Sequence, residues 1–232
     1  MLSDGLYVVS MKRGESMKTG VLICGLNGAG KSTLGKALAA RLGFHFIDNE
    51  DLYFPKTDPD YMYASARSRE EVEALLCSEI KMHENFIFVS VKGDYKIVEE
   101  SLAAGKNGNG MPADTGGRLP AEPTGAGVLA LAGSGKAVDS AGAVKWYVVW
   151  IEVPRDIRLK RVRDRSFAKF GERMLPGGDL QEQEESFFRF AEERAEDTVE
   201  TWLRTVGCPV IQVDGTKSAE ENVAFLAKRV LA

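Results

Sequence analysis

The residues of this chain best suited to chemistry form one glycine-rich run, Gly25-Leu-Asn-Gly-Ala-Gly-Lys-Ser-Thr33. The run matches the pattern Gly-x-x-x-x-Gly-Lys-Ser and lies between a short apolar stretch and a stretch with helical spacing. Glycines at positions 25, 28 and 30 let the backbone curl so that successive N–H groups face one phosphate group, and the following helix adds the positive end of its dipole. The pattern therefore predicts a loop that binds nucleotide phosphates.

Two side chains of this loop have expected chemical roles. Lys31 supplies a mobile positive charge for the β- and γ-phosphate oxygens, and the Ser32 hydroxyl can enter the coordination shell of Mg²⁺. We expect the nucleotide to contact Gly25, Asn27, Gly28, Ala29, Gly30, Lys31, Ser32 and Thr33.

The elements around the loop predict a parallel sheet. Residues 20–24 form a short apolar run that is typical of a buried strand, and from Lys31 the apolar residues follow helical spacing as far as Gly43, a natural C-cap. A second strand is expected at 44–47. Strand, helix and strand within about thirty residues form a βαβ unit, which makes parallel sheets.

The rest of the chain continues this alternation. A capping box at Ser68 and Glu71 starts a helix that runs to about Met82. Further strands are expected at 86–91, 145–151 and 210–213. Further helices are expected at 154–165 and at 218–231, and a long acidic helix, which includes 188–202, is expected between them. We interpret 52–67 as a loop or a short helical excursion and 166–178 as a loop. The predicted fold is a three-layer α/β/α domain with a five-stranded parallel sheet and a mobile lid.

One segment departs from this composition. Residues 101–143 hold 10 glycines and 3 prolines in 43 positions, too little apolar surface to offset chain entropy, and we predict a disordered insertion there. Residues 1–16 are expected to be an N-terminal extension, with Met17 as an alternative start. Residues 17–232 are expected to form a single domain that contains the phosphate loop and the insertion.

Composition limits the function classes. With 30 Lys and Arg against 34 Asp and Glu, the formal charge is −4, so there is no overall basic field for nucleic acid or an anionic membrane. No apolar run is long enough for a membrane span. Three widely spaced cysteines suit a reducing compartment. We expect a cytoplasmic protein with no nucleic-acid or membrane partner, either a monomer or a homodimer.

Two further motifs give a resemblance. The chain has no Asn-Lys-x-Asp for guanine and no Leu-Ser-Gly-Gly of transport ATPases. Phe46-Ile-Asp-Asn-Glu50 resembles the Phe-x-Asp-x-Asp of shikimate kinases, and Val213-Asp-Gly-Thr-Lys217 is similar to a near-terminal motif of adenylate kinases. The chain thus resembles the adenylate kinase, shikimate kinase and gluconate kinase group. The resemblance implies ATP and Mg²⁺ as cofactors.

The resemblance assigns roles to the acids that follow the second strand. It implies that Asp48 lies near Mg²⁺ through water and that Glu50 contacts the acceptor hydroxyl. Carboxylates at alternate positions of a strand end point the same way, toward the edge where the phosphate loop opens. Glu50 or Asp51 could then accept the proton of the acceptor hydroxyl.

Arginines carry the next set of roles. Positions 158, 161 and 165 share a helical face. The resemblance implies that Arg161 stacks on adenine and that Arg165 contacts phosphates, while Arg173 is the lid candidate. Arg189 could reach back from the next helix. A guanidinium binds two phosphoryl oxygens at once without losing a proton. Gly215 and Thr216 are expected beneath the adenine as binding residues.

The chain also departs from the group. Adenylate kinases have Asp-Gly-Phe-Pro-Arg and shikimate kinases a Gly-Gly-Gly turn after the third strand, where this chain has Ser90-Val-Lys-Gly-Asp-Tyr95, closer to gluconate kinases. Lys92 is therefore a candidate for binding an anionic acceptor, with Arg67 or Arg69 as a weaker one.

The function that these features predict is transfer of the γ-phosphate of ATP to a small-molecule acceptor. A nucleoside monophosphate kinase and a non-catalytic ATP-binding regulatory module stay as alternatives. His45 and His83 lack a metal-ligating neighbour at useful spacing, and we interpret both as structural.

Overall fold

The computed structural model describes residues 18–104 and 144–231. The predicted N-terminal extension, Met17 and most of the predicted insertion lie outside the described residues. Among the described helices, none is both long enough and apolar enough to cross a membrane.

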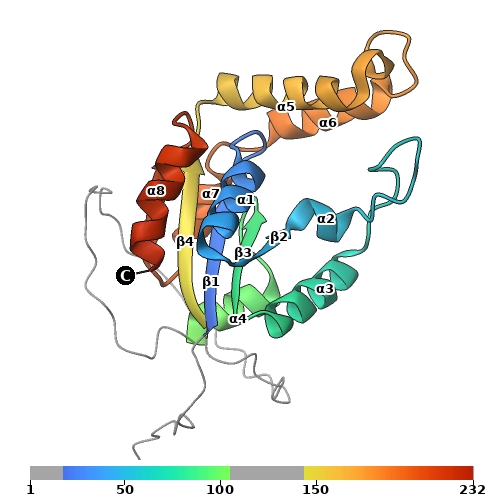
Figure 1. Ribbon diagram of the computed structural model, residues 1–232. Coiled ribbons are helices and arrows are strands. Elements are labelled where there is room, and N and C mark those ends of the chain that lie inside the picture. The colour runs from blue at the N-terminus through green and yellow to red at the C-terminus, as the bar shows by residue number, and fades with distance from the viewer. Residues whose placement is uncertain (1–17, 105–143, 232) are drawn as a thin grey trace, which may run out of the picture.

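The described part of the chain is built on a five-stranded sheet in which all neighbouring strands run parallel (Figure 1). The strand order is β2-β3-β1-β4-β5. The strands are β1 (Lys18–Cys24), β2 (His45–Asp48), β3 (Asn85–Ser90), β4 (Val144–Glu152) and β5 (Val210–Asp214). Because Cys24 pairs with both Ser90 and Trp150, the central strands end at a common edge, where ligands bind in open parallel sheets.

Helices cover both faces of the sheet, as the alternation of side chains in β1 requires. Val21 and Ile23 pack in the layer of α1 (Lys31–Leu42) and α8 (Ala219–Val230). Leu22 and Cys24 face the opposite layer, which contains α3 (Arg69–Met82), α4 (Lys96–Ala104) and α7 (Thr198–Leu203). The predicted three-layer α/β/α architecture and its five parallel strands are confirmed.

Helix boundaries follow their capping residues where the sequence signal was strong. Ser68 accepts a hydrogen bond from the Glu71 N–H, and the Glu71 side chain accepts one from the Ser68 N–H, which completes the predicted capping box of α3. Gly43 ends α1 with φ 70°, the left-handed conformation that glycine adopts most easily. Ser218 and Glu221 form a second capping box before α8.

Helix α5 is longer than the sequence indicated. It runs Arg155–Phe170 instead of ending at Arg165, so the predicted loop 166–178 is wrong in its first part. The sequence 166–170 contains no helix breaker, and the chain leaves the helix at Gly171, where φ is 58°. A 3-10 helix, η2 (Gly171–Met174), follows, and α6 (Gln181–Glu193) then returns alongside α5 (Figure 1).

The predicted long acidic helix is two helices. Its apolar stripe continues through Phe188, Ala191, Val199 and Trp202, all buried, but Arg194 has ψ 124° and ends α6. After this break the chain turns, and α7 packs in the same layer as α3 and α4. Periodicity alone could not detect this turn.

Helix α4 was not predicted from the sequence. It extends to Ala104, four residues into the predicted insertion, and Leu102 is buried. Ser101 accepts a hydrogen bond of 2.8 Å from the indole N–H of Trp146. The segment with unusual composition therefore begins after this helix, not at Ser101.

Candidate active site

The phosphate loop joins β1 to α1, as predicted. Gly28 and Gly30 have φ values of 81° and 94°, the region that glycine tolerates best. A Cβ on Gly28 would lie 2.2 Å from the main-chain oxygen of Arg158, so the loop is pressed against the beginning of α5. Glycine is required here by both backbone conformation and space.

The amino end of α1 is open for an anion. Its N-cap, Gly30, provides no side-chain hydrogen bond, and the first turn contains no acidic residue. The side-chain oxygen Oδ1 of Asn27 is buried without a hydrogen-bond partner. Exposed helical N–H groups with the positive end of a helix dipole form an anion site, and phosphate groups fit this loop.

Lys31 lies in a mixed electrostatic environment. Its ammonium donates a hydrogen bond of 3.1 Å to the carbonyl of Leu26. Burial lowers the pKa of Lys31 to about 8; the nearby Asp48 carboxylate opposes this shift, and the positive charge of Arg165 adds to it. The arrangement indicates that Lys31 lacks a full counter-charge, which the phosphates of a nucleotide would supply.

Asp48 and Glu50 are placed differently from the strand-end prediction. Asp48 is the last residue of β2, whereas Glu50 lies in the first turn of a short helix, α2 (Asn49–Tyr53). The Oδ1 atom of Asp48 accepts a hydrogen bond of 2.9 Å from the Glu50 N–H and so caps α2. The expectation that alternation along a strand aligns the two carboxylates was therefore wrong, since the helix starts immediately after Asp48.

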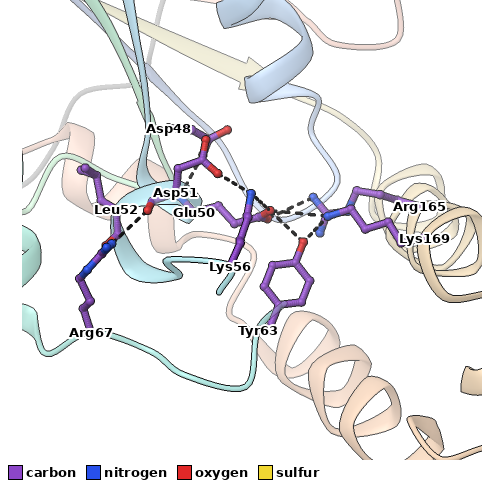
Figure 2. A network of polar contacts seen from close by, with 9 residues as sticks. All are labelled: Asp48, Glu50, Asp51, Leu52, Lys56, Tyr63, Arg67, Arg165 and Lys169. Atoms are coloured by element: carbon purple, nitrogen blue, oxygen red, sulfur yellow. Dashed lines mark hydrogen bonds and ion pairs between the residues drawn. The ribbon is translucent and has the colours of Figure 1, made fainter. Parts of the chain in front are cut away.

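Glu50 is surrounded by positive charge (Figure 2). The Tyr63 hydroxyl donates a hydrogen bond of 2.8 Å to Oε1. Three cations lie at 3.6 to 3.7 Å from the carboxylate: Lys56, Lys169 and Arg165. Burial alone would raise the pKa of Glu50, but Lys169, the Tyr63 hydroxyl, Arg165 and Lys56 together outweigh it and hold the pKa below its ordinary value.

This group, which we call the Glu50 cluster (Glu50, Lys56, Tyr63, Arg165 and Lys169), joins three parts of the chain. It has one carboxylate and three cations, so it carries excess positive charge. Such a cluster is able to receive a second anion. Arg165 is also close enough to Lys31 to lower the pKa of that lysine, so it links the cluster to the phosphate loop.

The other predicted acceptor residues are held elsewhere. The Asp51 carboxylate contacts Lys56 and is more than half exposed. Arg67 donates a hydrogen bond of 2.7 Å to the carbonyl of Leu52, and in Figure 2 it lies on the side away from Arg165. Lys92, just after β3, pairs with Asp94 at 3.0 Å. Arg67 and Lys92 thus lie outside the Glu50 cluster, and Asp51 contacts it only through Lys56.

The expected adenine contacts do lie together. Arg161 donates a hydrogen bond of 3.0 Å to the carbonyl of Gly215, in the turn that follows β5. A Cβ on Gly215 would lie 3.1 Å from the carbonyl oxygen of Ala29. Thr216 is exposed and donates from both its N–H and its hydroxyl to Asp214. The turn thus packs beside the phosphate loop.

The remaining arginines have separate partners. Arg158 is buried and donates to both carboxylate oxygens of Glu196 at 2.7 Å and to the carbonyl of Asn27, so it braces the loop instead of facing solvent. Arg69 stacks over Tyr95 and donates to Glu73. In this structure the guanidinium groups of Arg158 and Arg69 are therefore held by partners within the protein.

The predicted lid residues lie at the end of the α5 and α6 pair. Arg173 is exposed, forms a two-pronged ion pair with Asp179 and donates a hydrogen bond of 2.9 Å to the carbonyl of Asp60. Arg189 is exposed on α6. Neither contacts the Glu50 cluster among the described residues. Their role as lid arginines stays a prediction.

The loop between α2 and α3 also reaches this helical pair. The Tyr61 hydroxyl donates a hydrogen bond of 2.9 Å to Glu184, a buried residue of α6. Both Tyr61 and Tyr63 pack against the ring of Phe170. These contacts connect the helical pair to the loop that carries part of the Glu50 cluster.

Sequence reasoning missed four residues of the site: Lys56, Tyr63, Lys169 and Arg194. Lys169 follows Arg165 by four residues, a signal that was hidden because the helix was predicted to end too early. Arg194 is partly buried at the end of α6; burial lowers its pKa, against the attraction of Asp94. Its charge also lowers the pKa of Lys31.

Comparison with known proteins agrees with this geometry. Residues 27–58, which include most of the phosphate loop and the acids after β2, match the family model of shikimate kinase. The chain resembles the P-loop small-molecule kinases. The match and the fold support a phosphotransferase of this group.

Two full-length relatives extend the comparison. YqaC of Bacillus subtilis strain 168, an uncharacterized protein, is 26% identical over 215 residues, which span 89% of this chain and 94% of YqaC. A solved structure from Chloroflexus aurantiacus, assigned as a candidate kinase, is 11% identical with a TM-score of 0.50 and covers 92% of this chain and 98% of its own. This likeness shows that the two chains share a fold.

A third comparison concerns a shikimate kinase from Bacteroides thetaiotaomicron. Its solved structure is 16% identical, has a TM-score of 0.47 and covers 92% of this chain and 99% of its own.

Proposed function

We propose that this protein is an ATP- and Mg²⁺-dependent phosphotransferase that moves the γ-phosphate of ATP to a small-molecule acceptor. The observation that carries the proposal is the position of Arg165, which acts electrostatically on both Lys31 of the phosphate loop and the carboxylate of Glu50. A single guanidinium therefore lies between the side that suits a nucleotide and the side that suits an acceptor.

The residues present fit the two cofactors. The open amino end of α1, with its unpaired N–H groups, suits the phosphates of ATP. Ser32 and Asp48 offer the hydroxyl and carboxylate oxygens that Mg²⁺ prefers, and Asp48 uses only Oδ1 to cap α2. When bound, Mg²⁺ supplies charge neutralisation between the β- and γ-phosphates.

Transfer requires that the acceptor oxygen attack the γ-phosphorus while the bond to the β,γ-bridging oxygen breaks, which releases ADP. Lys31 and Arg165 would neutralise the oxygens on which charge develops. The acceptor proton goes to Glu50. Arg165 and Lys169 hold the pKa of Glu50 low. If these two side chains move from Glu50 to the incoming phosphates, the pKa of Glu50 would rise and the carboxylate would become a better base.

The acceptor is expected to be anionic, because Lys56, Arg165 and Lys169 are opposed only by Glu50 and, at Lys56, by Asp51, which leaves one positive charge in excess. Sugar acids and other small carboxylates satisfy this condition, and so do nucleoside monophosphates, the acceptors of the alternative kinase class.

The test is ADP release from MgATP with a panel of acceptors: shikimate, gluconate, other sugar acids and nucleoside monophosphates. Lys31→Ala serves as the blank, and Lys36→Ala, an exposed lysine on the same helix, is the matched control. We expect acceptor-dependent release by the wild type and Lys36→Ala and none by Lys31→Ala. ATP binding without any acceptor-dependent release would favour the regulatory module, and full activity of Lys31→Ala would refute the proposal.

A further inference from the structure

A second cluster of chemically active side chains lies away from the phosphate loop. His45 is the first residue of β2, Glu79 lies in the last turn of α3, and His83 is the residue that caps α3. The amino end of β2 is opposite to the sheet edge that carries Asp48 and the loop. Among the described residues, these three form the one group of histidine, cysteine and acidic side chains arranged to hold a metal ion.

The three side chains meet at one carboxylate oxygen. The Nε2 atom of His45 lies 2.8 Å from Oε2 of Glu79, and Nε2 of His83 lies 3.5 Å from the same oxygen. All three ligand atoms lie within 4.8 Å of one another. The interpretation of the two histidines as lacking a ligand neighbour was wrong, because Glu79 precedes His83 by one helical turn and the fold adds His45.

These distances suit a transition metal. With metal–nitrogen and metal–oxygen bonds of about 2.1 Å, the ligand atoms of a tetrahedral zinc site are separated by roughly 3.4 Å. The measured separations of 2.8 and 3.5 Å lie on either side of this value. The side chains are 30 to 36% exposed, so an ion can reach them from solvent without any opening of the core.

We propose that His45, Glu79 and His83 bind one divalent transition-metal ion, with Zn²⁺ as the best match. Two imidazoles favour Zn²⁺ over Mg²⁺ or Ca²⁺, which prefer oxygen ligands. Three protein ligands leave a fourth position for water. The site lies outside the catalytic region, so its role is to join the beginning of β2 to the end of α3.

Binding must change the orientation of the two rings. Their centroids are 3.5 Å apart and their planes differ by 11°. Each nitrogen lone pair lies in its own ring plane, so two parallel rings cannot both direct a lone pair at one ion. Binding therefore requires the two imidazoles to rotate out of their stacked arrangement, so the stacked pair separates when the ion binds.

The test uses untagged, metal-free protein without nucleotide, titrated with Zn²⁺ in excess Mg²⁺, which occupies oxygen sites. Glu79→Gln, His45→Asn and His83→Asn each remove one ligand. Cys77→Ser is the matched control because it removes a different zinc-binding side chain from the same helix. Calorimetry gives stoichiometry and affinity, thermal melting gives the effect on stability, and Co²⁺ absorption reports the ligand geometry.

We expect binding of one Zn²⁺ per chain by the wild type and Cys77→Ser, with a melting temperature higher by roughly 5 to 10 °C at free Zn²⁺ about 100 times Kd. Each ligand variant should melt as a folded protein without metal and lose at least tenfold in affinity. The absence of stoichiometric binding by the wild type, or unchanged affinity in all three folded variants, would overturn the proposal.

Discussion

Arg161 and Gly215 are 54 residues apart in the chain, yet the Arg161 guanidinium donates a hydrogen bond of 3.0 Å to the main-chain carbonyl of Gly215. The Gly215 N–H in turn donates to the carbonyl of Glu152 at 2.9 Å. These bonds fix the turn after β5 between β4 and α5. The turn therefore forms a wall that packs against the phosphate loop at Ala29.

The first prediction concerns this wall. Arg161→Ala removes a charged hydrogen bond to Gly215 and one surface for a planar base, so the KM for ATP should rise about tenfold, a change of about 1.4 kcal/mol. The value of kcat should change much less. Steady-state kinetics at saturating acceptor measure both constants.

Lys160→Ala is the control for Arg161→Ala, since Lys160 is exposed on the same helix and pairs only with Asp164 among the described residues. If the two substitutions raised the KM for ATP equally, Arg161 would affect ATP binding only through the positive charge that it adds to the helix.

The second prediction concerns pH. In the free protein the pKa of Lys31 is lowered from 10.5 to about 8, so the lysine begins to lose its charge above pH 8. Bound phosphates would hold the proton on Lys31. The value of kcat/KM for ATP should therefore fall about tenfold per pH unit above about pH 8, while kcat stays constant to higher pH.

Lys31→Arg provides the control, because a guanidinium does not titrate in this range. Its kcat/KM is expected to be lower overall but free of the alkaline limb, and a limb that persists in this variant would assign the titration to another group. For stability the sign is opposite. The folded pKa of Lys31 lies below the unfolded one, so the cost of burying its charge falls as pH rises from about 8 to 10.5.

The sequence predicted those parts of the site that depend on local chemistry. Gly28, Gly30 and Lys31 could be identified because the loop motif specifies both backbone conformation and contacts. Ser68 and Gly43 set helix ends through capping, which acts over a few residues. These signals require no knowledge of the tertiary structure.

The parts that were missed depend on contacts between distant segments. Lys56, Tyr63 and Lys169 meet at Glu50 only because a loop after α2 and the end of α5 approach each other, and no spacing in the sequence encodes that approach. Arg158 shared a helical face with Arg161, but its burial against Glu196 is a tertiary effect. Periodicity identifies a face of a helix but does not identify what covers it.

The third prediction separates two reasons for glycine in the phosphate loop. Both positions have a left-handed backbone, which strains an alanine. In Gly28→Ala the new Cβ also lies 2.2 Å from the Arg158 carbonyl oxygen, whereas in Gly30→Ala it meets no atom within 4 Å. Strain alone costs roughly 1 to 2 kcal/mol. Gly28→Ala should therefore reduce the free energy of unfolding, measured with denaturant, by more than Gly30→Ala does.

Gly43→Ala is the matched control for Gly30→Ala, since it has the same kind of backbone and open space but lies outside the loop. Both should lose similar stability, while only Gly30→Ala should weaken ATP binding. Equal losses for Gly28→Ala and Gly43→Ala would mean that the loop can move away from α5 at little cost.

The fourth prediction concerns Glu50. Glu50→Gln keeps the shape of the side chain and the acceptor for the Tyr63 hydroxyl but removes the proposed base. We expect kcat to fall by about 10² to 10⁴-fold, the usual contribution of general base catalysis, with little change in the KM for ATP. The substitution also leaves Lys56, Arg165 and Lys169 without their shared anion, so the variant should be less stable at neutral pH.

The pH dependence of stability tests the same carboxylate. Since the folded pKa of Glu50 is lowered, its stabilising effect is present above the unfolded pKa and is lost as pH falls through the folded pKa. The difference in stability between wild type and Glu50→Gln should therefore shrink in acid. Glu70→Gln, at an exposed position on α3, should change neither kcat nor this profile. If Glu50→Gln retained full kcat with every acceptor in the panel, the carboxylate would have only the electrostatic role of holding the three cations together.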